Sequence, residues 1–575
     1  MAETLISPGV LARENDTSFV SQGPITAGAA IIGPTVKGPV EIPTVVTSYS
    51  QFQQKYGTTF SSGSPAQTYT YFTSIAARNY FNNGGTSLLV ARVVTGSYTP
   101  ASSSLIVSAS GATSPVFVLE TLSEGTIMNS SGSEDSTGAL SNGTADNVRW
   151  QIVNSNTSSG TFDLLIRQGN DNTLEQTVLE TWTNLSLDPF ASNYVAKVIG
   201  DQKYTLRTDS GTSTKYLQLT GSFPNQSAYV RVKSVNLTTP NYFSNAGTPN
   251  PLYTGSLPII ASGSFGGAIG SIRGGAKFYD QINSTDTQGL TPGCYDNMVD
   301  LLANQDDYKY NVMLTPGLCN NLTNHPSVIN DIISTMQNRG DAIYVTDMVE
   351  YGVGSVTTVT GQAATKNTSY AATYWPWVQI QDTDSGQNVW VPASTVIGGV
   401  YAYNDSVSEP WFAPAGINRG GLTVIMAERR LPQGDRDTLY NGKVNPIASF
   451  PGTGVVVYGQ KTLQTRASAL DRVNVRRLLI ALKNYISQVA NNLVFEQNTA
   501  ATRNNFLAQV NPYLESVQQR QGLFAFQVIM DDTNNTPTVI DQNQMVGQIY
   551  LQPTKTAEFI YLDFNITPTG ATFPA

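Results

Sequence analysis

The chain has 575 residues, of which 40% are hydrophobic and only 13% are charged, and its formal net charge at pH 7 is −9. The length predicts about two to four domains, because one hydrophobic core rarely serves more than about 250–300 residues. The acidic balance argues against a nucleic-acid-binding protein, which needs a basic surface to neutralise phosphates. The low charge density is typical of a subunit covered by other subunits, since interface cores are depleted of charge.

The sequence contains no apolar run long enough to span a bilayer, and its first residues lack the basic and apolar regions of a secretory signal peptide. Its two cysteines, Cys294 and Cys319, are too few for a disulfide framework. We expect two buried free thiols, with a single bridge between them as the alternative. These features favour assembly in a reducing cytoplasm.

The first 94 residues divide into an arm and a compact α/β unit. Residues 1–24 contain a turn signal, SPGV, and no periodicity, so we expect an extended arm that is ordered only against another sheet. Residues 25–94 alternate between strand and helix patterns. The predicted elements are strands at Ala27–Ile32, Ile42–Val46 and Ser87–Val94, a helix near Ser48 with Phe52 and Tyr56 one turn apart, and a helix at Ala66–Asn82.

The composition shifts at residue 95. Residues 95–258 are rich in Ser, Thr, Asn and Gly and contain short alternating segments such as VRWQIV and TFDLLIR, which predict an inserted β-rich domain that protrudes. The Gly-rich stretch at 263–275 lacks the Lys-Ser/Thr ending of a phosphate loop and the dinucleotide-binding spacing. We expect a flexible junction there.

Residues 259–440 resume the α/β pattern. Helices are predicted at Tyr295–Gln305 and His325–Gly340, and strands at Tyr310–Pro316 and Asp341–Asp347. This alternation predicts βαβ units and a parallel or mixed sheet. Together with residues 25–94, this segment would form a discontinuous α/β core.

The sequence has no recognisable catalytic or metal-binding constellation. Its only histidine, His325, stands at a predicted helix start, and we expect it to be solvated or to cap that helix. The carboxylate pairs at 306–307 and 531–532 lie in turn-like segments, where neighbouring side chains usually point apart. We therefore expect no enzyme activity, no cofactor and no metal site.

Residues 441–575 are predicted to form a C-terminal domain around one long helix, Arg466–Glu496. Its apolar residues follow three-and-four spacing and must face a core: Val475, Leu478, Leu482, Ile486, Val489 and Leu493. Arg472, Arg476 and Lys483 lie on one line about a quarter-turn away. This basic line suits an acidic partner, but an ordinary solvated helix face has the same spacing.

The chain closes on a strand-like segment, Gln548–Pro568, in which Ile560, Leu562 and Phe564 share one face. With an arm at each end of the chain, strand exchange between subunits becomes an attractive hypothesis. Spacing alone does not separate it from an internal edge strand.

At these residues the sequence resembles the tail sheath proteins of contractile-tailed bacteriophages, a family that includes sheaths of pyocins and related contractile injection systems. The resemblance covers both ends and most of the α/β core. It runs in order through SPGV, IIGPTVKGPVEIPTVVTSYSQFQQKYG, YFNNGGTSLLVARVV, YNVMLTPGL, RGDAIYVTD, YAATYWPWVQIQD, NPIASFPGTGVVVYGQKTL, VNVRRLLIALKNYISQVANNLVFEQN and PTKTAEFIYLDF. The inserted domain is the part that it does not cover.

The resemblance implies an α/β and β multidomain protein: an α/β sheath core with extended arms and an inserted β-rich outer domain. Such subunits stack as hexameric rings around an inner tail tube, between baseplate and terminator proteins, and contract to drive the tube through the host envelope. The implied location is the virion, after assembly in the host cytoplasm. Neither direct nucleic-acid binding nor membrane insertion is implied.

Carried onto this chain, the resemblance makes Glu3–Arg13 and Glu558–Thr567 the arms and the basic line the tube contact. The expected strand contacts are Leu5, Ile6, Val10, Leu11, Phe559, Ile560, Tyr561 and Leu562. Two other functions stay open: a non-contractile tail-fibre or adhesin protein that binds through its insert, and a cell-surface polysaccharide hydrolase.

Overall fold

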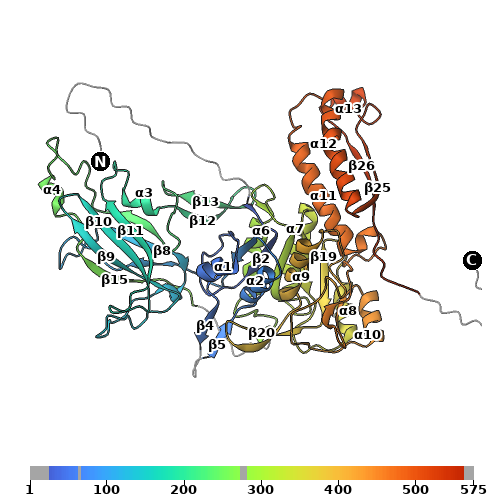
Figure 1. The fold of residues 1–575 in the computed structure, drawn as a ribbon, viewed down its shortest axis with the longest axis horizontal. Coiled ribbons are helices and arrows are strands. Elements are labelled where there is room, and N and C mark those ends of the chain that lie inside the picture. Colours follow the sequence, from blue (N-terminus) through green and yellow to red (C-terminus); the bar gives the residue numbers. More distant parts are fainter. Residues whose placement is uncertain (1–24, 63–66, 272–280, 562–575) are drawn as a thin grey trace, which may run out of the picture.

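The computed structural model describes residues 25–62, 67–271 and 281–561. Within these ranges the molecule has three parts, which Figure 1 shows side by side. A β-rich part lies at one end, an α/β part lies in the centre, and two long helices with a β-hairpin rise from the other end. The mixed α/β and β fold expected from the sequence is confirmed.

The central part is built on an eight-stranded sheet. It is mostly parallel, and only the first and last strands in the order below run antiparallel to their neighbours. In spatial order the strands are β24 (Gly454–Val457), β23 (Asn445–Phe450), β19 (Ala371–Trp375), β18 (Ile343–Asp347), β17 (Val312–Cys319), β2 (Ala29–Gly33), β6 (Leu88–Arg92) and β3 (Thr44–Val46). Five of them (β2, β6, β17, β18 and β19) are buried at every residue, as expected for near-continuous apolar strands covered on both faces.

Alternate residues of β2, β6, β17 and β18 belong to two separate apolar clusters, one on each face of the sheet. One face is covered by α1 (Tyr49–Tyr56), α2 (Phe72–Asn82) and α9 (Ser394–Val407). The other face is covered by α6 (Asp296–Leu301), α7 (His325–Arg339), α8 (Val356–Ala364) and α10 (Gln433–Asn441). The predicted βαβ arrangement is therefore confirmed.

One predicted helix is too long at its start. The segment expected as helix from Ala66 contains β5 (Gln67–Thr70), which pairs with β4 (Thr59–Ser62), and α2 begins only at Phe72. The reason is non-local, because the Phe60 ring packs against Tyr69 and Tyr71 at centroid distances of 5.6 and 5.1 Å. These aromatic contacts hold the segment in a strand.

Smaller sheets complete the centre. β1 (Ile25–Thr26) pairs with β16 (Tyr308–Lys309). A three-stranded sheet contains β20 (Val378–Asp382), β21 (Gln387–Val391) and β22 (Met426–Ala427). In the described ranges Cys294 and Cys319 are free thiols, as expected, and Cys319 is buried while Cys294 is partly so.

The inserted part has its own core and a seven-stranded sheet. In spatial order the strands are β11 (Val178–Ser186), β10 (Thr161–Gln168), β9 (Val148–Asn156), β15 (Ala261–Gly266), β7 (Pro100–Ser103), β8 (Phe117–Glu124) and β14 (Val230–Val235), and two short helices, α3 (Val195–Ile199) and α4 (Pro251–Thr254), accompany them. β15 lies in the middle of this sheet, so the insert extends past residue 258. The first glycines of the expected junction are therefore strand residues.

A hairpin of β12 (Lys203–Thr208) and β13 (Lys215–Thr220) runs from the insert toward α6 (Figure 1). Its Leu206 and Leu217 pack against the apolar cluster on the α6 face of the central sheet. The insert thus contacts the core through this hairpin as well as through the two chain crossings.

The C-terminal part contains α11 (Val473–Asn491), α12 (Ala500–Gln519), α13 (Pro537–Asp541) and a hairpin of β25 (Leu523–Ile529) and β26 (Gln548–Pro553). They share a fourth apolar cluster. The expected domain boundary at residue 441 needs correction, because β23 and β24 complete the central sheet. In the described part of the chain, no helix is long and apolar enough to cross a membrane.

Candidate assembly interface

The apolar stripe predicted for the long helix is confirmed on α11. Leu478, Leu482 and Val489 are buried against Val510 and Leu514 of α12. The helix is shorter than expected, because Ser468 caps a short 3₁₀ turn at Ala469–Asp471 and Arg472 is extended, so α11 begins at Val473. The stripe fixes α11 between α12 and the central part.

The three basic residues expected to form one exposed line lie in three different environments. Arg476 is buried at 4% exposure, donates to Ser369 Oγ, and stacks over the Tyr370 ring at 4.0 Å. Burial lowers the pKa of its guanidinium. Lys483 is exposed, with Nζ 3.3 Å from Tyr370 Oη. The prediction that all three charges contact a partner is therefore wrong for Arg476, whose guanidinium is buried inside its own subunit.

Arg472 points instead toward the last described segment of its own chain. Its Nε and Nη2 donate to the two carboxylate oxygens of Glu558 at 2.8 and 2.9 Å. Tyr440 Oη and Gln460 Nε2 donate to the same carboxylate at 2.7 and 3.0 Å. No local pattern could have revealed this contact, since Arg472 and Glu558 are 86 positions apart.

A fourth basic residue, Arg477, was not singled out from the sequence. It is 4% exposed, pairs with Asp405 of α9, and stacks over Tyr401 at 4.7 Å. With Arg476 it fastens the start of α11 onto the central part. Guanidinium groups suit this role because they remain charged when buried and stack on aromatic rings.

The chain after β26 contacts its own subunit at Thr556 and Glu558 and is exposed from Phe559 to Tyr561. The predicted final strand is confirmed over Gln548–Pro553, where it pairs with β25, but residues 554–561 form no strand. Phe559, Ile560 and Tyr561 are 69%, 76% and 89% exposed. The other predicted arm contacts, Leu5, Ile6, Val10, Leu11 and Leu562, lie outside the described residues.

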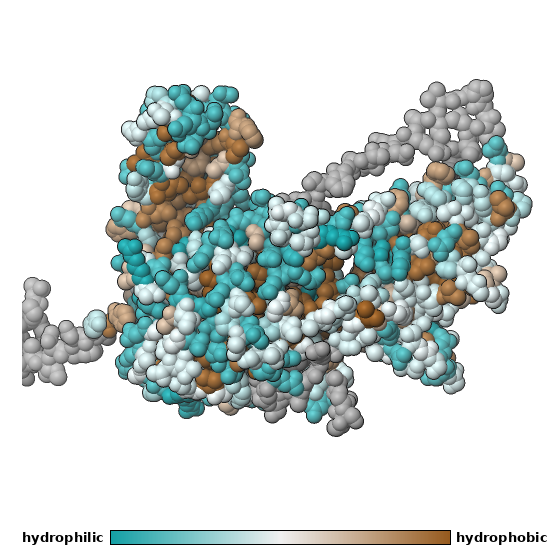
Figure 2. Space-filling model, turned by 180° about the vertical axis from the view of Figure 1, so that it is seen from behind, coloured by the Kyte–Doolittle hydropathy of each residue, from teal (hydrophilic) through white to brown (hydrophobic). Residues whose placement is uncertain are grey.

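The hairpin beside this segment is a sheet of only two strands. Among the described residues, no third strand pairs with β25 or β26. Several side chains of its core are only partly buried, and Phe524 and Tyr550 on the hairpin are 76% and 55% exposed. Figure 2 shows a band of apolar surface over this part of the molecule, at the upper left.

The crevice where α/β sheets usually bind ligands is filled by the chain itself. Strand order reverses between β2 and β17, and ligands typically bind beyond the carboxyl ends of strands at such a point. There the fully buried Gln288 accepts from Phe72 N–H, at the start of α2, at 2.8 Å and donates to Pro316 O at 3.0 Å. Gly317, at φ 102°, leaves space for it.

His325 is neither solvated nor a cap of α7, contrary to the expectation. It is fully buried, its Nδ1 accepts the Cys319 N–H at 3.1 Å, and its Nε2 is 2.9 Å from Asn283 O. Burial lowers its pKa, so it serves as a neutral brace at the start of α7. Within the described ranges, no group of three His, Cys, Asp or Glu residues could hold a metal ion.

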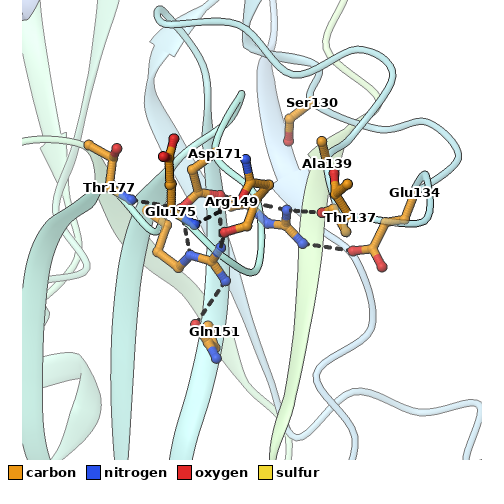
Figure 3. Close-up of polar contacts among 12 residues, drawn as sticks. Ser130, Glu134, Thr137, Ala139, Arg149, Gln151, Asp171, Glu175 and Thr177 are labelled. Atoms are coloured by element: carbon orange, nitrogen blue, oxygen red, sulfur yellow. Dashed lines mark hydrogen bonds and ion pairs between the residues drawn. The ribbon is translucent and has the colours of Figure 1, made fainter.

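A polar cluster in the insert, drawn in Figure 3, has a structural explanation. Arg167 donates to both carboxylate oxygens of Asp171 at 2.7 and 2.9 Å, and Arg149 bonds Glu134 and Gly138 O. Thr177 N–H also donates to Asp171. The cluster ties the loops at 131–147 and 169–177 to β9 and β10, as buried charges require partners.

The geometry defines a mixed α/β protein of several sheets whose C-terminal part presents an incomplete two-stranded sheet and an outgoing segment. The same fold occurs in the crystal structure of a sheath tail protein from Listeria innocua, which matches with a TM-score of 0.52 and 10% identity over 92% of this chain and 95% of that one. At this identity the match shows the fold alone.

The family comparisons are more specific. Residues 295–463 match the phage tail sheath protein central domain, and residues 465–567 match the phage tail sheath C-terminal domain. The two matches follow one another along the chain, and both are domains of the phage tail sheath family. The domain boundary between the two matches falls after β24, in agreement with the sheet.

Curated tail sheath proteins show the same relationship. That of Vibrio phage KVP40 is 41% identical over 220 residues, or 37% of this chain and 32% of the relative. That of Enterobacteria phage T4 is 42% identical over 187 residues, or 32% of this chain and 28% of the relative. The matched part thus spans about a third of the length of these relatives.

Proposed function

We propose that this chain is the subunit of a contractile tail sheath, a structural protein of a phage virion. The observation that carries the proposal is the succession of both sheath domains along residues 295–463 and 465–567. The subunits would stack as hexameric rings into a helical jacket around an inner tube, with the baseplate and a terminator protein at its ends. Contraction would drive the tube through the host envelope.

The C-terminal hairpin supports a role in joining subunits. A two-stranded sheet is marginally stable alone, and its free edges can accept strands from other chains. Added strands would cover the partly exposed apolar side chains beside β25 and β26. We propose that residues 3–13 and the segment after β26 supply such strands between neighbouring copies.

Contact with the tube remains a proposal for the exposed part of the basic line. Lys483 is the residue of that line whose charge faces solvent on the described surface. Exposed charge pairs contribute only ~0.2–1 kcal/mol each, so many such contacts could be broken together during contraction. No nucleotide is needed in this scheme, since burial between subunits would supply the energy.

Negative-stain electron microscopy of the purified full-length chain tests the proposal. We expect striated tubes, and we expect a chain lacking residues 1–13 to stay folded but unable to polymerise. Isolated trimeric fibres would instead favour the adhesin function. Cleavage of cell-surface polysaccharide, lost on substitution of an acidic residue, would favour the hydrolase function.

A further inference from the structure

The last described segment is fastened to its own subunit mainly at one carboxylate. Glu558 accepts four hydrogen bonds from three parts of the chain: Arg472 before α11, Tyr440 on α10, and Gln460 after β24. Gln460 Nε2 also donates to Thr556 Oγ1 at 2.7 Å. The residues between β26 and Glu558 are exposed.

This contact differs from an ordinary surface ion pair. The Arg472 and Glu558 side chains are only 25% and 18% exposed, so solvent and salt screen the pair weakly. The guanidinium engages the carboxylate with two parallel bonds, which adds geometric specificity. Two neutral donors satisfy the remaining oxygen positions.

The protonation states of the groups are those that the hydrogen bonds require. Burial alone would raise the pKa of Glu558, but the bonds from Arg472, Tyr440 and Gln460 outweigh it and lower that pKa. Burial, aided by the bond to Glu558, raises the pKa of the Tyr440 phenol, so Tyr440 stays a donor. The carboxylate is therefore ionised and fully paired near neutral pH.

The chain changes character directly after Glu558. Phe559, Ile560 and Tyr561 expose at least 69% of their surface, although each would be stabilised by burial. A pocket of about 380 Å³ lies beside them, between Ser468–Val475 and Pro553–Phe559. Three consecutive large apolar side chains in solvent are typical of a segment that binds a partner.

We propose that Glu558 is the anchor at which each subunit fixes the point of departure of its C-terminal arm, so that the segment exchanged with a second copy begins at Phe559. The inference rests on the proposed strand exchange between subunits. A force applied to the arm would then be transmitted through Glu558 to α10, to the start of α11 and to the loop that contains Gln460. The two-stranded hairpin β25–β26, which precedes Glu558 in the chain, would not bear that force.

Tryptic cleavage of the full-length unassembled chain tests the anchor independently of assembly. Lys555 is exposed, but trypsin binds several residues on each side of the cleaved bond in an extended conformation, so cleavage after Lys555 requires Glu558 to detach, and its rate follows the population of the detached form. We expect Glu558→Ala and Arg472→Ala each to accelerate release of residues 556–575 at least about tenfold, and Tyr440→Phe to do so less. Glu515→Ala, at an exposed position of α12, is the matched control and should cleave at the wild-type rate.

The double variant Glu558→Ala/Arg472→Ala should cleave no faster than Glu558→Ala alone, because removal of the Glu558 carboxylate already removes its contact with Arg472. The anchor would be overturned if Glu558→Ala were cleaved at the wild-type rate. It would also be overturned if the increase in cleavage rate of the double variant equalled the product of the two single increases. Unchanged thermal unfolding of the variants shows that the loss is local, and Glu558→Gln provides a milder change if Glu558→Ala fails to fold.

Assembly of the same variants separates this inference from the proposed function. Striated tubes of Glu558→Ala should dissociate on dilution at least about tenfold faster than those of Glu515→Ala. Tubes that are as durable as wild type would overturn the role of the anchor in assembly. If the wild-type chain forms no tubes, the proposed function fails, while the cleavage rates still decide whether Glu558 holds the segment.

Discussion

The burial of Asp347 leads us to expect that the free energy of unfolding of this protein falls as the pH rises toward neutrality. The carboxyl group is 3% exposed at the end of β18, and Ser394, the first residue of α9, donates to it through its backbone N–H at 3.1 Å and through Oγ. Burial raises its pKa from 3.8 to about 7, although the Ser394 bonds act in the opposite direction. Asp347→Asn keeps the shape and removes the ionisation.

The magnitude follows from the two pKa values. Below pH 3.8 the group is protonated in both states, and between pH 3.8 and about 7 the unfolded chain ionises while the folded chain retains the proton. Stability therefore falls by ~1.4 kcal/mol per pH unit in this window and is constant above it. The full loss is about 4 kcal/mol, of which about 3 kcal/mol lies between pH 5 and 8.

Urea unfolding followed by tryptophan fluorescence at pH 5 and pH 8 measures the effect. The free energy of unfolding of the wild type, relative to Asp347→Asn, should fall by about 3 kcal/mol between the two pH values. His325 is present in both proteins, so its contribution to the pH dependence is removed by the comparison with Asp347→Asn. Asp306→Asn, in an exposed turn, is the control and should show the wild-type pH dependence. Equal pH dependence in wild type and Asp347→Asn would show that the Ser394 donors and the α9 N-terminus keep the carboxylate ionised despite burial.

Two further predictions concern single side chains. Gln288→Ala should lower the free energy of unfolding by ~2–4 kcal/mol, because it leaves the buried Phe72 N–H and Pro316 O unpaired; a change below ~1 kcal/mol in urea unfolding would contradict the filled-crevice interpretation. Arg476→Glu should lower the free energy of unfolding by ~3–5 kcal/mol, because it buries an unpaired charge. Lys483→Glu should change the free energy of unfolding by less than ~0.5 kcal/mol but should weaken binding to the tube. Equal thermal stability of these two variants would contradict the buried position of Arg476.

Elements with strong local signals were predictable from the sequence. Ser48 caps α1 by accepting from Gln51 N–H, and Phe52 and Tyr56 on that helix are buried as their spacing indicates. Gly340 ends α7 in the left-handed conformation, at φ 70°, which glycine adopts without strain. The long C-terminal helix and the final strand exist near the predicted positions, as α11 and β26.

The errors share a different origin, since each depends on a contact between distant residues. The strand at Gln67–Thr70 exists because of Phe60, and the insert continues to Gly266 because β15 pairs with β9 and β7. His325 is buried because Asn283 O and Cys319 N–H happen to meet its ring. Periodicity carries no information about such partners.

The sequence by itself determined the alternation of strands and helices, the apolar stripe of α11 and the likeness to tail sheath proteins, because these are properties of neighbouring residues and of their order. Only the tertiary structure decided what the charges do. Spacing predicted Arg472, Arg476 and Lys483 on one helix line, yet the structure pairs the first with Glu558, buries the second on Tyr370 and leaves the third in solvent. The physical reason is that a side chain's environment depends on which distant elements pack against it, and helix spacing specifies only a direction.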